Sequence, residues 1–161
     1  MYLYNKLHKK LTLKVVCDKP LAYSSSFLEI VNIKWTRKNA IYHMTNAHIG
    51  IMPLLDNEYN KGKGGFKLVQ YLSIGLPCIG SNVGYNKLVI GDNCGFLAKD
   101  EGDWLKAVET LSNVNVWKQY SSNAYKYWLE HFSFDKNKVI FLFLLFTKNL
   151  RLNYKVATAR T

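Results

Sequence analysis

The sequence predicts an α/β fold, in which a Rossmann-like parallel sheet is covered by helices on both faces. Short runs rich in branched apolar residues alternate along the chain with longer segments of helical periodicity. Glycine and proline stop signals, such as Gly75 followed by Pro77, separate these segments. Strands that alternate with helices pair in parallel and are buried on both sides, so this order favours the α/β class.

In the first part of the chain, the predicted strands are rich in valine and isoleucine. YLYNKLHKKL, residues 2–11, is predicted to end an amphipathic helix. The predicted strands are LTLKVVCD, FLEIVNIKWT and HIGIMPL, and the predicted helix RKNAIYHMTNA lies between the second and the third. A polar loop containing YSSS joins the first two strands.

The second part begins with a glycine- and lysine-rich loop, residues 61–67, which leads into the predicted helix FKLVQYLSI. The inward face of this helix is either Phe66, Val69 and Leu72, or Leu68 with Leu72. PCIGS and CGFLA are predicted strands, and YNKLVI is a helical turn or two. EGDWLKAVETLS and VNVWKQYSSNAYKYWLEHF are predicted amphipathic helices.

Length and charge indicate one domain with an anionic partner. The chain has 161 residues and a net charge of +11. We expect one domain over residues 1–134, and a last helix or a poorly ordered tail over residues 135–161. An excess of positive charge favours an anionic partner. Nucleic acid, a membrane surface and a phosphorylated small molecule are all compatible with it, and the charge alone does not distinguish them.

Several common kinds of site find no support in the sequence. The three cysteines form no C-x-x-C pair and are interpreted as small buried side chains in a reducing compartment. No H-E-x-x-H or D-x-D motif is present, and DEGD is typical of a helix N-cap, so no metal is expected. The apolar run VIFLFLLF is far shorter than the about 20 residues that span a bilayer. We expect a cytoplasmic protein, with membrane association left open.

The glycine-rich loop is the strongest candidate for a site. In an α/β sheet, a loop between a strand and a helix lies at the carboxyl ends of the strands, where ligands bind. Glycines let an anion approach the backbone, and the helix N-terminus offers free N–H groups. The P-loop pattern G-x-x-x-x-G-K-[ST] is absent. The spacing therefore suits a phosphate-binding loop and a mobile basic surface loop equally well.

The wider stretch resembles a known family. GIMPLLDNEYNKGKGGFKLVQYLSIGLPCIGSNVGYNKLV, followed by GFLAKDEGDWLKAVETL, is similar to the donor-binding domain of group 1 (family 4) retaining glycosyltransferases. The resemblance covers about Leu11 to Phe134, and its specific part is the run Gly62–Gly84. It implies that the Rossmann-like domain is the C-terminal half of a GT-B fold, whose substrate is a nucleotide-diphosphate sugar.

The resemblance also implies which residues bind the donor. Gly64, Gly65 and Phe66 match the loop that takes the sugar and the pyrophosphate, and Lys63 and Lys67 are the cations left to offset the diphosphate charge. Gln70 stands at the second glutamate of the E-x7-E motif, which binds the ribose. The first glutamate falls at Gly62, where Glu58 is the nearest substitute. Weaker candidates in the loop SNVGYN, which equally suits a simple turn, are Val83, Gly84 and Asn86.

The expected function is sugar transfer from a nucleotide-diphosphate sugar to an acceptor hydroxyl, in polysaccharide or glycan biosynthesis. The acceptor would be a glycan or a lipid-linked sugar. No cofactor beyond the donor substrate is expected, and the sequence identifies no catalytic residue. A GT-B enzyme holds its acceptor on a second domain, so we expect this chain to be inactive alone. Two alternatives stay open: a non-catalytic truncated remnant, and a basic nucleic-acid-binding module, although nucleic acid is not the expected partner.

Overall fold

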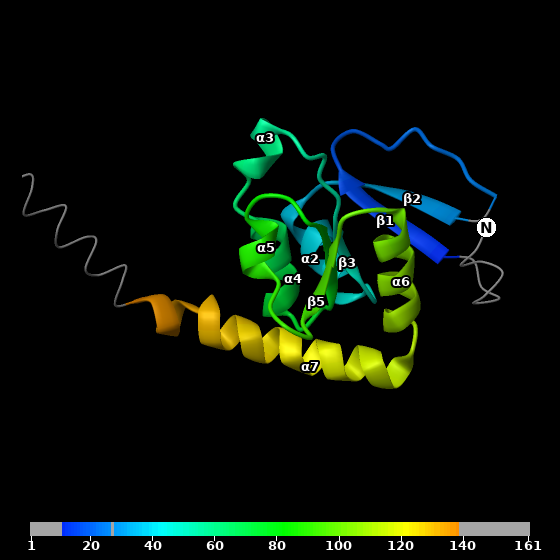
Figure 1. Ribbon diagram of the computed structural model, residues 1–161. Coiled ribbons are helices and arrows are strands. Elements are labelled where there is room, and N and C mark those ends of the chain that lie inside the picture. Colours follow the sequence, from blue (N-terminus) through cyan, green and yellow to red (C-terminus); the bar gives the residue numbers. More distant parts are fainter. Residues whose placement is uncertain (1–10, 27, 139–161) are drawn as a thin grey trace, which may run out of the picture.

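Parallel strands and interleaved helices make up the protein, which is an α/β fold (Figure 1). The computed structural model describes residues 11–26 and 28–138. The strands are β1 (Leu11–Cys17), β2 (Leu28–Lys34), β3 (Gly50–Met52), β4 (Cys78–Ser81) and β5 (Gly95–Ala98). The helices are α2 (Arg37–Thr45), α3 (Glu58–Lys61), α4 (Phe66–Ser73), α5 (Asn86–Val89), α6 (Glu101–Leu111) and α7 (Val114–His131).

A three-stranded parallel sheet in the order β3-β4-β5 forms the centre of the fold. Cys78 in β4 lies opposite Gly50 of β3 and Gly95 of β5. Every residue of β4 is buried, as expected for the middle strand of a sheet that is covered on both sides. Helices α4 and α5 lie to one side of this sheet in Figure 1, α6 lies to the other, and the long helix α7 runs across one end.

Two hydrophobic clusters cover the two faces of β4, because successive side chains of a strand point to opposite faces. Cys78 belongs to the first cluster, together with Leu68, Leu72, Val89, Cys94 and Ala124 from α4, α5, the segment before β5, and α7. Ile79 belongs to the second cluster, together with Ala98, Ala107 and Leu111 from β5 and α6. Both faces of the central sheet are therefore buried under helices.

The first two strands form a separate sheet. β1 and β2 pair in parallel, with Leu11 opposite Leu28 and Cys17 opposite Lys34. This differs from the single continuous sheet that the alternation of segments predicts. Neither strand buries a side chain fully, so apolar burial does not hold this pair against β3. One contact between β1 and the residue that follows α2 is polar: Lys14 Nζ donates to the carbonyl oxygen of Asn46 at 3.4 Å.

The predicted elements within the described residues are confirmed. In α4, Leu68 and Leu72 are buried, whereas Phe66 is 69% exposed, so the second of the two predicted inward faces is correct. Gly75 ends this helix with φ +66°. One expectation is wrong: Cys17 is exposed, because it ends β1, a strand that buries none of its side chains fully, whereas Cys78 and Cys94 are buried and free.

The ends of the chain are described in part. The predicted helix at residues 2–11 lies almost wholly outside the described residues, as does the apolar run at 139–146. A helical segment begins at residue 134 and is described as far as 138, near the predicted boundary between domain and tail. Within the part of the chain that is described, no helix is long and apolar enough to cross a bilayer.

Candidate anion-binding site at the start of α4

The predicted site lies in the connection between β3 and α4, which contains the single-turn helix α3. Asn57 caps α3, since its side chain accepts a hydrogen bond from the amide of Asn60 at 2.9 Å. Lys61 Nζ contacts Glu58 at 2.8 Å and Asp56 at 3.5 Å. Its hydrogen bond with Glu58, and then the charge of Asp56, raise the pKa of Lys61. Glu58 is therefore an exposed ion-pair partner in this structure.

Gly65 forms the corner from which α4 begins. It is the N-cap residue, and its φ of +65° lies in the left-handed region that favours glycine. A Cβ atom at this position would lie 2.8 Å from Val89 Cγ2. Gly65 thus brings the backbone close to α5 and turns the chain so that α4 can start there.

The first turn of α4 has no internal cap. Its N-cap makes no side-chain hydrogen bond, and the turn contains no acidic residue. Among the hydrogen bonds of the described residues, none is donated by the main-chain amides of Gly64, Gly65, Phe66 or Lys67. By contrast, Thr36, Asp100 and Asn113 cap α2, α6 and α7 with their side chains. The start of α4 therefore keeps the unpaired donors and the partial positive charge that attract an anion.

Gly64 and the two lysines, Lys63 and Lys67, belong to the same short segment as these amides. A Cβ atom on Gly64 would meet nothing within 4 Å, so the space in front of its backbone is open. Lys63 is half-buried, and its Nζ lies over the ring of Tyr59 at 5.0 Å from the centroid. Lys67 is exposed in the first turn of α4, and Phe66 beside it is exposed as well. The segment thus has cationic residues on both sides of an open stretch of backbone.

The second predicted loop, SNVGYN at residues 81–86, and the start of α5 pack against this part of the chain. Gly84 has a φ of +52°, and a Cβ atom there would overlap the backbone of Lys61. Asn86 is fully buried, and its Nδ2 donates to the carbonyl oxygen of Ser81 at 3.0 Å. Its Oδ1 has no hydrogen-bond partner in the part of the chain that is described, and it lies 3.5 Å from where a Cβ of Gly65 would be. Val83 is buried too. The side chains of Val83 and Asn86 position the site and do not open to solvent.

Gln70 lies one turn further along α4 than Phe66 and is half-buried. Helical side chains lean toward the N-terminus of their helix, so a side chain at position 70 can reach in the direction of the free N–H groups. A neutral amide can both accept and donate a hydrogen bond, which suits a pair of hydroxyl groups.

Sequence reasoning missed two features of the site. Lys61 neutralises Glu58, a pairing that the spacing of three residues on a helix could have indicated. Tyr59 and Tyr85, exposed by 79% and 55%, are aromatic side chains on α3 and directly before α5. Nothing in the local sequence distinguishes an exposed tyrosine at these positions from a buried one.

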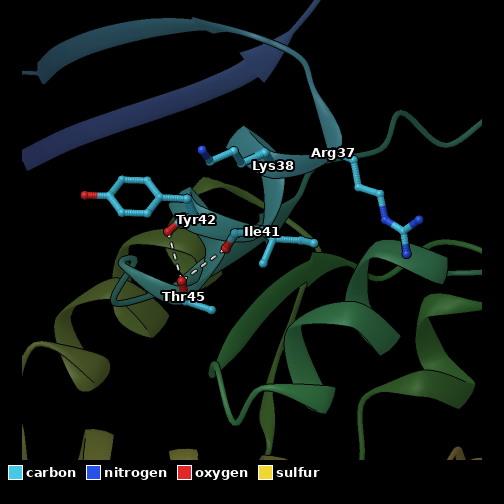
Figure 2. Close-up of a pocket in the computed structure, with 5 residues that line it drawn as sticks. All are labelled: Arg37, Lys38, Ile41, Tyr42 and Thr45. Carbon is cyan, nitrogen blue, oxygen red and sulfur yellow. Dashed lines mark hydrogen bonds between the residues drawn. The ribbon is translucent and has the colours of Figure 1, made fainter.

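A rival location is the outer face of α2, where Arg37, Lys38, Ile41, Tyr42 and Thr45 line a shallow depression of about 650 Å³ (Figure 2). The Thr45 hydroxyl donates to the carbonyl oxygens of Ile41 and Tyr42 in its own helix. Figure 2 shows Arg37 pointing away from Lys38 and Tyr42. A small-molecule site requires polar groups that converge on one point, and the polar groups of this depression do not.

Residues 11–26 and 28–138 contain no group of three His, Cys, Asp or Glu side chains that could hold a metal ion. Comparison of the chain with models of protein families and with curated proteins gave no match.

Proposed function

We propose that this chain is the donor-binding domain of a retaining GT-B glycosyltransferase, which transfers a sugar from a nucleotide-diphosphate sugar to an acceptor hydroxyl. The single observation that carries the proposal is the uncapped start of α4, where the amides of residues 64–67 have no acceptor among the described residues. The segment with the pattern G-x-P-x-I-x-S-x-V-G ends at Gly84, which packs on the backbone of Lys61 in the connection that leads to that corner.

The position of this corner in the fold supports the proposal, because α/β proteins bind ligands at the carboxyl ends of their parallel strands. α4 follows β3 and the loop before α5 follows β4, and these two strands are parallel neighbours in the central sheet. Their carboxyl ends therefore meet at one edge of the sheet, and both loops lie at that edge. In the proposed full GT-B domain, β1 and β2 would extend this sheet beside β3.

The chemical contribution of the site is electrostatic. When the bond between the sugar and the diphosphate breaks, its electron pair leaves with the diphosphate, whose negative charge rises. Donors that are already oriented toward this charge stabilise it without further rearrangement. The amides of Gly64, Gly65 and Phe66 supply fixed donors, and Lys63 and Lys67 supply full charges. The proposal needs no metal, because these groups provide the positive charge.

The rest of the donor would extend along α4. Gln70 can bind the ribose hydroxyls, while the exposed rings of Tyr59 and Phe66 offer surfaces against which a base can stack. The acceptor, a glycan or a lipid-linked sugar, would be held by a second domain, as in other GT-B enzymes. Glu58 would have to leave Lys61 before it could contact a sugar hydroxyl.

Isothermal calorimetry with UDP, GDP and ADP tests the proposal, with Gly64→Ala as the variant and Gly62→Ala as its matched control. A methyl group at position 64 points into open space, so the fold tolerates it, but it blocks close approach of a phosphate. We expect binding to weaken by about tenfold to a hundredfold, the value of one or two hydrogen bonds to a charged group. At position 62 the nearest contact is 3.6 Å, to the Tyr59 carbonyl oxygen, and nucleotide affinity should not change.

Two results would contradict this function. The first is failure of the wild-type chain to bind any of the nucleotides at millimolar concentration, which would favour a non-catalytic remnant. The second is equal affinity of Gly64→Ala and wild type, which would show that the amides are not the binding site. Strong RNA binding that falls steeply with salt would favour the nucleic-acid alternative. Thermal melting of each variant without ligand confirms that it is folded.

A further inference from the structure

The C-terminal end of α7 has an exposed apolar surface, which we call the α7-end patch: Tyr125, Leu129 and Phe134. These side chains are exposed by 47%, 42% and 75%. Tyr125 and Leu129 are four residues apart and so share one face of the helix. Leu129 and Phe134 line a depression of about 440 Å³ together with Trp128, Ser133, Asp135 and Lys136. In Figure 1 this end of α7 projects beyond the sheet and the other helices.

Two of the polar side chains that line this depression, Ser133 and Asp135, already have partners within the chain. The Ser133 hydroxyl donates to the Leu129 carbonyl oxygen at 2.7 Å. Asp135 forms an ion pair with Lys138 at 3.2 Å. The patch therefore offers an apolar floor rather than hydrogen-bonding groups, and an occupant with an apolar interior fits it better than a polar small molecule.

The charge around the patch is positive. Lys126 and Lys136 are exposed and have no ion pair among the described residues, while the exposed acids nearby are Glu130 and Asp135, the second of which is paired with Lys138. The sequence continues this character: after Asp135 it contains no acidic residue, but six cationic ones, Lys136, Lys138, Lys148, Arg151, Lys155 and Arg160. The apolar run VIFLFLLF begins directly after Lys138. Apolar and cationic residues thus occur together on both sides of the boundary at residue 138.

We propose that the α7-end patch docks on an anionic membrane surface, with Leu129 and Phe134 entering the interface and Lys126 and Lys136 facing the lipid headgroups. A surface that is apolar at its centre and cationic at its rim matches the boundary between acyl chains and anionic headgroups. The aliphatic Leu129 and the run VIFLFLLF favour lipid over nucleic acid, which binds cationic grooves with stacking aromatic rings. This proposal is independent of the proposed function.

Vesicle co-sedimentation of the full chain tests it, with phosphatidylcholine vesicles prepared with and without phosphatidylglycerol. The wild type should sediment only with the anionic vesicles. Lys126→Gln/Lys136→Gln should weaken partitioning by about 25-fold, since each cation near an anionic surface contributes about fivefold. Leu129→Ser/Phe134→Ser should weaken it by at least about tenfold, because apolar area no longer enters the interface.

The outer face of α2 provides a matched control. Ile41 and Tyr42 are exposed by 50% and 61%, and Arg37 and Lys38 adjoin them. Ile41→Ser/Tyr42→Ser should therefore leave vesicle binding unchanged if the α7-end patch is the docking surface. All substituted residues are exposed, and circular dichroism should show the fold intact in each variant.

Several results would overturn the proposal. One is equal binding of wild type and both α7-end variants, which would leave all membrane affinity to residues 139–161. Equal binding to neutral and anionic vesicles would remove the role of charge. Absence of vesicle binding together with a dimer in sedimentation velocity, lost in Leu129→Ser/Phe134→Ser, would identify a second copy of the chain as the occupant. A wild type that stays monomeric and binds no vesicle would exclude lipid as well.

Discussion

Replacement of Gly65 by alanine should destabilise the protein strongly. The expected loss of stability has two causes, one in the backbone conformation and one in the packing against Val89. Gly65 has a φ of +65°, where a residue with a Cβ atom is disfavoured by roughly 1–2 kcal/mol. The new methyl group would lie 2.8 Å from Val89 Cγ2, in a core where overpacking costs about 1–3 kcal/mol. Together these effects predict a loss of about 2–5 kcal/mol of unfolding free energy, out of a total of roughly 5–15 kcal/mol for a typical domain.

A double-mutant cycle with Val89→Ala isolates the packing part. Val89 is 2% exposed, and its truncation alone should cost roughly 2 kcal/mol. In Gly65→Ala/Val89→Ala the clash is gone, so the combined loss should be smaller than the sum of the single losses by about 1–3 kcal/mol. The backbone part should persist, because the positive φ does not depend on Val89.

Urea denaturation monitored by circular dichroism measures these free energies, and Gly62→Ala is the control. Gly62 has a φ of −76° and no contact shorter than 3.6 Å, so alanine there should be neutral or stabilising by about 0.4–1 kcal/mol. The reasoning is refuted if Gly65→Ala is as stable as Gly62→Ala. Additive losses in the cycle would show that Gly65 does not pack against Val89.

Two further predictions concern the core and the attachment of α7. Burial raises the pKa of the Cys78 thiol to about 12 from its ordinary value of 9.0, so the stability that this thiol contributes is complete below pH 9 and is lost as the pH rises toward 12. The unfolding free energy of wild type minus that of Cys78→Ala should therefore fall over this range by up to about 1.4 kcal/mol per pH unit, and a constant difference would contradict the shift. Trp117→Phe should cost about 1 kcal/mol in urea denaturation, because Trp117 Nε1 donates to the His48 carbonyl oxygen at 2.6 Å, whereas the exposed Trp35→Phe should cost nothing measurable. Equal losses for the two tryptophans would contradict the role of that bond.

The elements of the fold could be predicted from local sequence because each depends on local signals. Branched apolar residues in β1 and β2, the stop at Gly75 and the capping aspartate of α6 all act within a few residues of themselves. For β3, β4 and β5 the parallel direction also follows from sequence, since a helix between two strands lets the chain start the next strand at the same end of the sheet. β1 and β2 are parallel as well, although residues 18–26 between them form no helix.

Only the tertiary structure determined how the strands divide into two sheets and which structural role each glycine of the loop has. β1 and β2 separate from β3–β5 because sheet pairing depends on what covers each strand, and that covering comes from distant segments. Gly62, Gly64 and Gly65 stand almost side by side in the sequence, yet one ends α3, one faces open space and one packs on Val89. The positive charge of the loop was visible in the sequence. Whether the amides beside it were free was not, because a hydrogen-bond partner can come from any part of the chain.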